Sequence, residues 1–155
     1  MEKYDSAVDT NHHRYRVSAI LCKMSKLLLD KANAHDLSKL EEPEKSIFDK
    51  FTPKLKDSTY GSKEYTEFLK EMEPALNHHY RNNQHHPEHY GNGIDGMTIL
   101  DLLEMFCDWK AASERHADGS IEKSIEINTP RFKISDQLKS IFKNSVYLME
   151  DKTWK

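Results

Sequence analysis

The chain has 155 residues, of which 37% are hydrophobic and 32% charged, and its formal net charge is −3 with the histidines neutral. This length suits one domain with a single core. The charge balance argues against broad, sequence-independent binding of nucleic acid, which needs a surplus of Lys and Arg. The opening residues, MEKYDSAVDTNHH, contain no apolar signal core, and no apolar run reaches membrane-spanning length. We therefore expect a cytoplasmic protein with no membrane partner.

Apolar residues recur at helical spacing through most of the chain. We expect helices in five places: 11–31, the stretch after Pro43, 62–81, 97–116 and around 136–149. Pro74 should break or kink the third of these. We find no alternating pattern typical of a strand. The sequence therefore predicts an all-α fold, a compact bundle of five to seven helices that forms one domain over 1–155, with 1–10 and 150–155 as peripheral tails.

Histidines gather in one polar stretch around the segment NNQHHPEHY. The members of this group are His78, His79, His85, His86 and His89. Histidine is the commonest metal ligand and is also frequent on wet surfaces, so the group alone leaves both interpretations open. Because Pro87 follows the histidine pair, we expect an extended backbone before it, which would aim the two rings differently.

A stripe of carboxylates runs along the helix expected over 97–116. Asp101, Glu104 and Asp108 follow one another at spacings of three and four, with nothing basic among them. Solvation of a polar face would explain the stripe, and metal coordination would explain it too, since a cation removes the repulsion. His13 lies on the apolar stripe of the first expected helix, where a hydrogen-bonded core-edge histidine and a metal ligand are both open interpretations.

The segment AHDLSKL places His35 and Asp36 side by side, with Lys39 three residues later. Asp36 or Ser38 could simply cap the following helix, but a cap does not account for His35 or Lys39. The pattern resembles the HD-x-x-K signature of the HD-domain metal-dependent phosphohydrolases.

Further segments carry the same resemblance. His13, about one helix upstream, and Asp108, within EMFCDWKAA, are similar to the flanking ligands of an HD site. His79, followed by the pair His85 and His86, resembles the extra histidines of binuclear HD proteins such as the HD-GYP phosphodiesterases. The Gly-Tyr-Pro motif is missing, so cyclic-di-GMP activity is not implied. The combination of HDLSK, HHYRNNQHH and EMFCDW resembles a small HD-like family of phages and bacteria, over most of the chain.

This resemblance implies a metal-dependent phosphohydrolase that cleaves a nucleotide or another small phosphoester or phosphodiester with a metal-activated water. It implies one or two divalent ions, and imidazole with carboxylate ligation suits Mn, Fe, Zn, Ni or Co. The implied metal ligands are His13, His35, Asp36, His79, His85, His86 and Asp108. Whether both rings of the histidine pair bind metal stays open.

Charged and polar residues near these motifs are the expected catalytic and substrate-binding groups. Catalytic roles are expected for Asp36, Lys39 and Glu104. Substrate contacts are expected for Lys39, Arg81, Asn83 and Arg131. A surface ion pair with Glu88 is the alternative for Arg81, and exposure on a solvated face is the alternative for Glu104.

Two other functions fit the sequence. A catalytically silent module would keep the metal and sequester a nucleotide or signal, and a helical interaction protein would carry its histidines as surface residues only. In each metal-binding case we expect a small phosphorylated partner, first of all a nucleotide, in the cytoplasm of a bacterium or a phage-infected cell. Homo-oligomerisation stays open.

Overall fold

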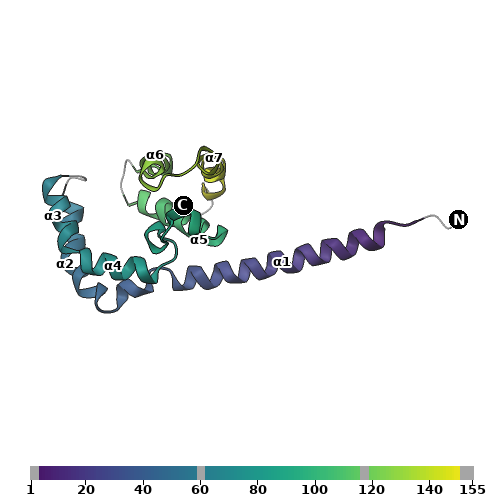
Figure 1. Ribbon diagram of the computed structural model, residues 1–155, viewed down its shortest axis with the longest axis horizontal. Coiled ribbons are helices and arrows are strands. Elements are labelled where there is room, and N and C mark those ends of the chain that lie inside the picture. Colours follow the sequence, from purple (N-terminus) through teal and green to yellow (C-terminus); the bar gives the residue numbers. More distant parts are fainter. Residues whose placement is uncertain (1–3, 59–61, 116–118, 151–155) are drawn as a thin grey trace. The chain divides into compact units, whose positions relative to one another are not determined.

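The computed structural model describes residues 4–58, 62–115 and 119–150, and over these residues it contains only helices. The α-helices are α1 (Ala7–Ala34), α2 (Glu44–Asp57), α3 (Lys63–Glu71), α4 (Glu73–Asn82), α5 (Ile99–Ser113), α6 (Ile121–Phe132) and α7 (Asp136–Ser145) (Figure 1). Short 3-10 helices are η1 (Leu37–Leu40), η2 (Pro87–His89), η3 (Gly93–Gly96) and η4 (Val146–Met149). The prediction of an all-α fold is confirmed.

The chain divides into two units, Met1–His35 and Asp36–Lys155. The prediction of one domain over 1–155 therefore stays a prediction. The expected tail over 1–10 is partly helical, because α1 begins at Ala7. Of the two expected tails, 1–3 and 151–155 lie outside the described residues.

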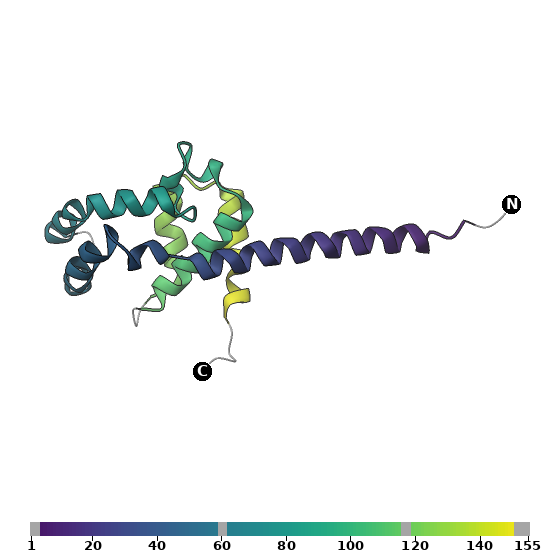
Figure 2. The same cartoon turned by 90° about the horizontal axis from the view of Figure 1, so that it is seen from below.

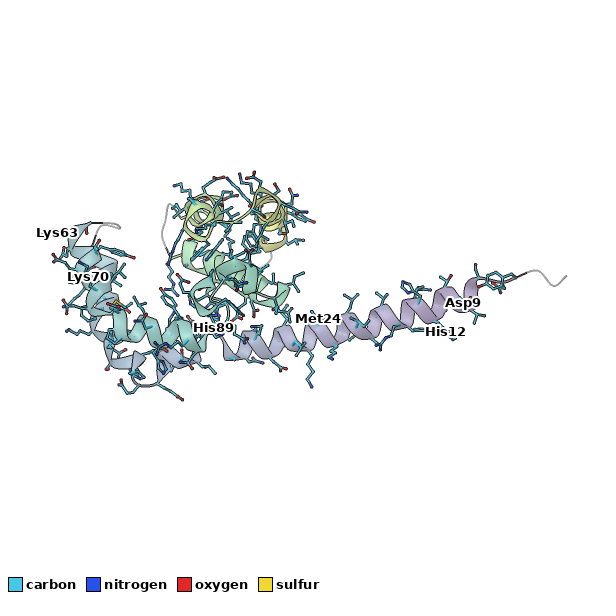
Figure 3. The ribbon with its side chains drawn as sticks, viewed as in Figure 1. Asp9, His12, Met24, Lys63, Lys70 and His89 are labelled. Atoms are coloured by element: carbon cyan, nitrogen blue, oxygen red, sulfur yellow. The ribbon has the colours of Figure 1, made fainter. Side chains whose placement is uncertain are left out.

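The first unit is α1, an unbroken helix in both views (Figure 1 and Figure 2). It extends the helix expected over 11–31 in both directions. Its apolar residues include Ile20 and Met24, of which Met24 is labelled in Figure 3, and no residue of the helix is buried. Within the described part of the chain, neither α1 nor any other helix has the length and apolarity needed to cross a membrane.

The second unit begins with a group formed by α2, α3 and α4, in which α2 contacts both of the others. Phe51 and Met72 are each 2% exposed there, and the Phe51 ring lies 6.0 Å from the Phe68 ring between centroids. The helix expected over 62–81 is broken at Met72, and Pro74 lies in the first turn of α4, where its missing N–H costs nothing. The predicted break at Pro74 is confirmed.

The remaining helices, α5, α6 and α7, surround the largest buried apolar cluster. Its members are Met105, Phe106, Ile121, Ile125, Ile134, Phe142 and Val146. The sequence did not predict α6, since few of its residues are apolar and Pro130 lies inside it. Ser135 caps α7, because its side chain accepts a hydrogen bond from the Leu138 amide.

A capping box starts α5 and explains one carboxylate of the stripe. Asp101 Oδ2 accepts hydrogen bonds from the Thr98 amide at 2.8 Å, the Thr98 hydroxyl at 2.6 Å and the Tyr90 hydroxyl at 2.9 Å. The helix ends at Ser113, and His116, the end of the predicted range, lies outside the described residues. Asp101 is therefore the buried third residue of the capping box, whose cap is Thr98.

Candidate metal centre

Asp36 opens the second unit and forms the centre of the candidate site. Its backbone lies in the left-handed region, with φ 57° and ψ 12°, which Asp tolerates better than most residues. The Asp36 side chain makes no capping hydrogen bond to η1. Capping therefore does not account for this residue, and its carboxylate belongs to the cluster described next.

Three imidazole rings converge on Asp36. His79 Nε2 lies 3.3 Å and His85 Nε2 lies 3.5 Å from Asp36 Oδ1. His86 Nε2 lies 2.9 Å from His79 Nε2. One potential ligand atom from each of the four residues lies within 4.8 Å of the other three. We refer to Asp36, His79, His85 and His86 as the histidine–aspartate cluster.

The end of α4 brings the three rings together. His79 lies in the last turn of this helix, and the chain leaves the helix at Asn83 in an extended conformation. His86 is also extended, as predicted from Pro87, with φ −98° and ψ 126°. The rings of His85 and His86 lie 4.1 Å apart between centroids at an angle of 44°. Both rings of the pair therefore reach the cluster.

The separations within the cluster fit a first-row divalent ion. With bonds of about 2.1 Å, ligand atoms lie about 3.4 Å apart in a tetrahedron and neighbouring ones about 3.0 Å apart in an octahedron. The contacts of Asp36 with His79 and His85, at 3.3 and 3.5 Å, match the tetrahedral value, whereas His79 Nε2 and His86 Nε2, at 2.9 Å, lie at a hydrogen-bond distance. The residues present fit a tetrahedral ion once the His79 and His86 rings move apart.

Two carboxylates lie behind two of the rings. Glu44 Oε2, in a side chain with 0% exposure, lies 2.9 Å from His79 Nδ1, and Glu104 Oε1 lies 3.1 Å from His85 Nδ1. When Nδ1 donates to the carboxylate, the Nε2 of the neutral ring carries a lone pair; when Nε2 is protonated, the ring donates to Asp36 instead. These Nε2 atoms face Asp36, which is the arrangement of metal-binding imidazoles backed by carboxylates.

Hydrogen bonds around Glu44 extend this support. The second oxygen of Glu44 lies 2.7 Å from His78 Nδ1, and the Ser38 hydroxyl donates to Glu44 Oε2 at 3.0 Å. Asn83, predicted to contact substrate, is 8% exposed and donates to Ser38 Oγ and to the His79 carbonyl, both at 2.8 Å. Asn83 therefore holds the rings from behind instead of facing a ligand. Glu44 was missed because an acidic residue at a helix start is common.

The surroundings set the charges of the cluster. Burial favours a higher pKa for Asp36, but hydrogen bonds with His79, His85 and Lys39 outweigh it and hold this pKa well below its usual range. Burial, followed by the proximity of His85 and His79, lowers the pKa of His86 to about 3. At neutral pH Asp36 is therefore ionised and His86 is neutral, which are the protonation states that metal binding requires.

Two further predicted residues lie beside Asp36. Lys39 Nζ lies 2.5 Å from Asp36 Oδ2 and 5.4 Å from the centre of the Phe48 ring. A carboxylate oxygen of Asp108, on α5, lies within 4.8 Å of one from Asp36. Lys39, Asp108 and Glu104 were all predicted as site residues from the sequence. The structure therefore places most of the predicted site residues around Asp36.

His13 and His35 lie on the first unit, at opposite ends of α1. The helix is continuous between them, so about 33 Å separates the two residues along its axis at about 1.5 Å per residue. One ion cannot be held by both of these residues of one chain while α1 is unbroken. The resemblance implies both residues as metal ligands, and the helix excludes that they share one ion.

The predicted arginines lie outside the histidine–aspartate cluster. Arg131, at the end of α6, forms an ion pair with Glu88 at 2.9 Å, so the partner considered for Arg81 pairs with Arg131. Arg81 is exposed on α4. His89, labelled in Figure 3, points its Nδ1 to the Tyr80 carbonyl at 3.0 Å and is not a member of the cluster.

Together, the fold and the site define an all-α protein with a partly buried histidine–aspartate cluster backed by carboxylates. Residues 2–150 match the model of DUF5662, a family of unknown function, and the chain belongs to that family. No curated protein and no solved structure matches the chain.

Proposed function

We propose that this protein is a metal-dependent phosphohydrolase that cleaves a nucleotide or another small phosphoester. The observation that supports this proposal is the convergence of the His79 and His85 Nε2 atoms on Asp36 Oδ1, with His86 Nε2 next to His79 Nε2. Imidazole with carboxylate ligation suits Mn, Fe, Zn, Ni or Co. When bound, such an ion supplies a water that is nucleophilic at neutral pH and positive charge for the phosphoryl oxygens.

Among the described residues, Lys39 is the one best placed to bind the phosphate. Its side chain is 33% exposed, so an incoming anion can reach the ammonium group next to Asp36. In this proposal Lys39 exchanges part of its contact with Asp36 for a phosphoryl oxygen and stabilises the charge that develops there. Glu104 contacts His85 Nδ1 and acts as a positioning residue for that ring.

A second function is a module that binds a nucleotide without cleaving it. Two of the groups expected to catalyse, Lys39 and Glu104, both contact members of the cluster, Asp36 and His85. Groups engaged in this way hold the metal ligands in position and are less available to act on a bound substrate. Binding without product is therefore the alternative outcome of the following experiment.

The test compares Asp36→Asn with the control Asp49→Asn. Asparagine keeps the shape of Asp36 and also tolerates a left-handed backbone. Asp49 has a side chain 64% exposed on α2, where it pairs with Lys45. Each purified protein is reconstituted with Mn or Zn, its metal content is measured by elemental analysis, and product formation is followed with mononucleotides, cyclic nucleotides and dinucleotides.

We expect wild type and Asp49→Asn to retain metal and to release product, and Asp36→Asn to lose both. Stoichiometric nucleotide binding with no product from any substrate would favour the sequestering module. Less than about half an equivalent of metal in the reconstituted wild type would overturn both metal-dependent functions.

A further inference from the structure

A cavity lies beyond the histidine pair, within the second unit. It has a volume of about 450 Å³ and is bounded by residues between Pro87 and Asp95 and by the end of α6. Small-molecule sites typically have volumes of about 300–1,000 Å³, so this cavity is large enough for one ring system. Pro87, which follows His86 directly, forms part of its wall.

The lining of the cavity combines flat apolar surfaces with polar groups. Tyr90 and Phe132 supply aromatic rings, and Asn92 supplies an amide. Gly93 has a φ of +63°, and a Cβ built at Gly91 or Gly93 would meet nothing within 4 Å. Backbone is therefore directly accessible on this side of the cavity. Such a lining suits a planar ligand with hydrogen-bonding edges.

The charges that line the cavity cancel formally. Glu88 and Arg131 form an ion pair at 2.9 Å, and the remaining charged lining residues are Asp95 and Lys133. The Arg131 guanidinium also lies 4.6 Å from the centre of the Phe132 ring. Sites for phosphate groups carry an excess of positive charge. The cavity is therefore better suited to an uncharged polar group than to a second phosphate.

Tyr80 connects this cavity to the histidine–aspartate cluster. Its ring lies 5.0 Å from the His86 ring and 6.2 Å from the His79 ring between centroids. Pro87 lines the cavity and directly follows His86 in the chain, and the Tyr80 ring packs against the His86 ring. The cavity wall is therefore continuous in sequence with the histidine–aspartate cluster.

We propose that this cavity binds the nucleobase of a nucleotide whose phosphate lies at the histidine–aspartate cluster. Glu88 accepts a hydrogen bond from the edge of the base, Arg131 donates one, and the aromatic ring of Tyr90 packs against the base. Binding of the phosphate half rests on the proposed function, whereas binding of the base rests on the cavity alone.

The test separates the two halves of the ligand. Binding of unphosphorylated nucleosides and of ribose 5-phosphate to the full chain is measured by calorimetry and by saturation-transfer NMR, with and without Mn²⁺. The variants are Arg131→Gln and Glu88→Gln, with Arg115→Gln as a control at an exposed position. An exposed ion pair contributes little to stability, so the variants should fold, and thermal melting verifies this.

We expect at least one nucleoside to bind without added metal, and about tenfold more weakly to each cavity variant than to the control. Ribose 5-phosphate should require metal and bind all three variants equally. If no nucleoside binds, or if both cavity variants bind nucleosides like the control, the cavity proposal is overturned even where the enzyme proves active. Nucleoside binding that the cavity variants weaken, in a protein that takes up no metal, would support the cavity while refuting the proposed function.

Discussion

Replacing Glu44 by Gln tests whether the histidine–aspartate cluster depends on the carboxylate behind it. Glu44 is 0% exposed and contacts His78 Nδ1 at 2.7 Å, His79 Nδ1 at 2.9 Å and the Ser38 hydroxyl at 3.0 Å. Glutamine has the same size but keeps only one acceptor oxygen, and its amide nitrogen only donates. In Glu44→Gln at least one of these contacts therefore loses its acceptor oxygen.

The expected magnitude follows from these contacts. Loss of a carboxylate that orients a metal-binding histidine typically lowers metal affinity about 10- to 100-fold, or about 1.4–2.7 kcal/mol. Removing one partner of a buried hydrogen bond costs about 1–3 kcal/mol of folding stability. Because three contacts meet on one fully buried carboxylate, we expect a stability loss in the upper half of that range.

The assay is a competition titration of Zn²⁺ or Mn²⁺ against a chromophoric chelator. Wild type and Glu44→Gln are compared with Glu67→Gln, a control on α3 whose side chain is 59% exposed. Urea denaturation of the metal-free proteins, carried out in parallel, gives the change in the free energy of unfolding.

Equal metal affinity of wild type and a folded Glu44→Gln protein would refute the positioning role of Glu44. A loss of stability with unchanged affinity would mean that Glu44 serves only the packing of α2 against α4. A loss of affinity in the Glu67→Gln control would show that the titration reports general charge instead of the geometry at His79.

Two further predictions concern the helices around the main apolar cluster. Phe142→Ala should lower the free energy of unfolding by about 3–5 kcal/mol, because Phe142 is 4% exposed and its ring stacks on the Phe106 ring at 4.8 Å between centroids. Urea denaturation measures this free energy, and a change below about 1 kcal/mol would contradict the packing. Hydrogen bonds from Lys139 and Lys143 lower the pKa of Glu126 from 4.5 to about 2. The folded pKa lies below the unfolded one, so this stabilisation is present above pH 4.5 and is lost as the pH falls through about 2. The difference in melting temperature between wild type and Glu126→Gln should therefore shrink on acidification, and a constant difference would count against the contact.

Much of the helical structure was predictable because helices depend on neighbours in sequence. The periodic apolar residues of α5, the break at Pro74 and the cap at Ser135 all act within a few residues. The prediction failed at α6, where Pro130 and the polar residues weaken the pattern although Ile121 and Ile125 are buried. The role of Asp101 was similarly ambiguous, because an aspartate in a helix capping box and an aspartate that binds a metal ion look the same in a sequence.

The candidate site shows a comparable division. The resemblance named Asp36 and the three converging histidines, but their meeting depends on contacts of α4 with η1 and η2. The role of Glu44 was not predictable, because only packing reveals that this acidic side chain is turned inward. The role of Asn83 was not predictable either, because polar residues commonly follow helices and only the structure shows its hydrogen bonds to Ser38 and to the His79 carbonyl.

By itself, the sequence determined the all-α class, the approximate positions of most helices and the residue types available for metal binding. The tertiary structure decided which of these residues meet: Asp36 and His79 lie far apart in sequence and join only where α4 packs beside η1. The physical reason is that helical hydrogen bonds are local, whereas a ligand cluster is assembled by long-range packing.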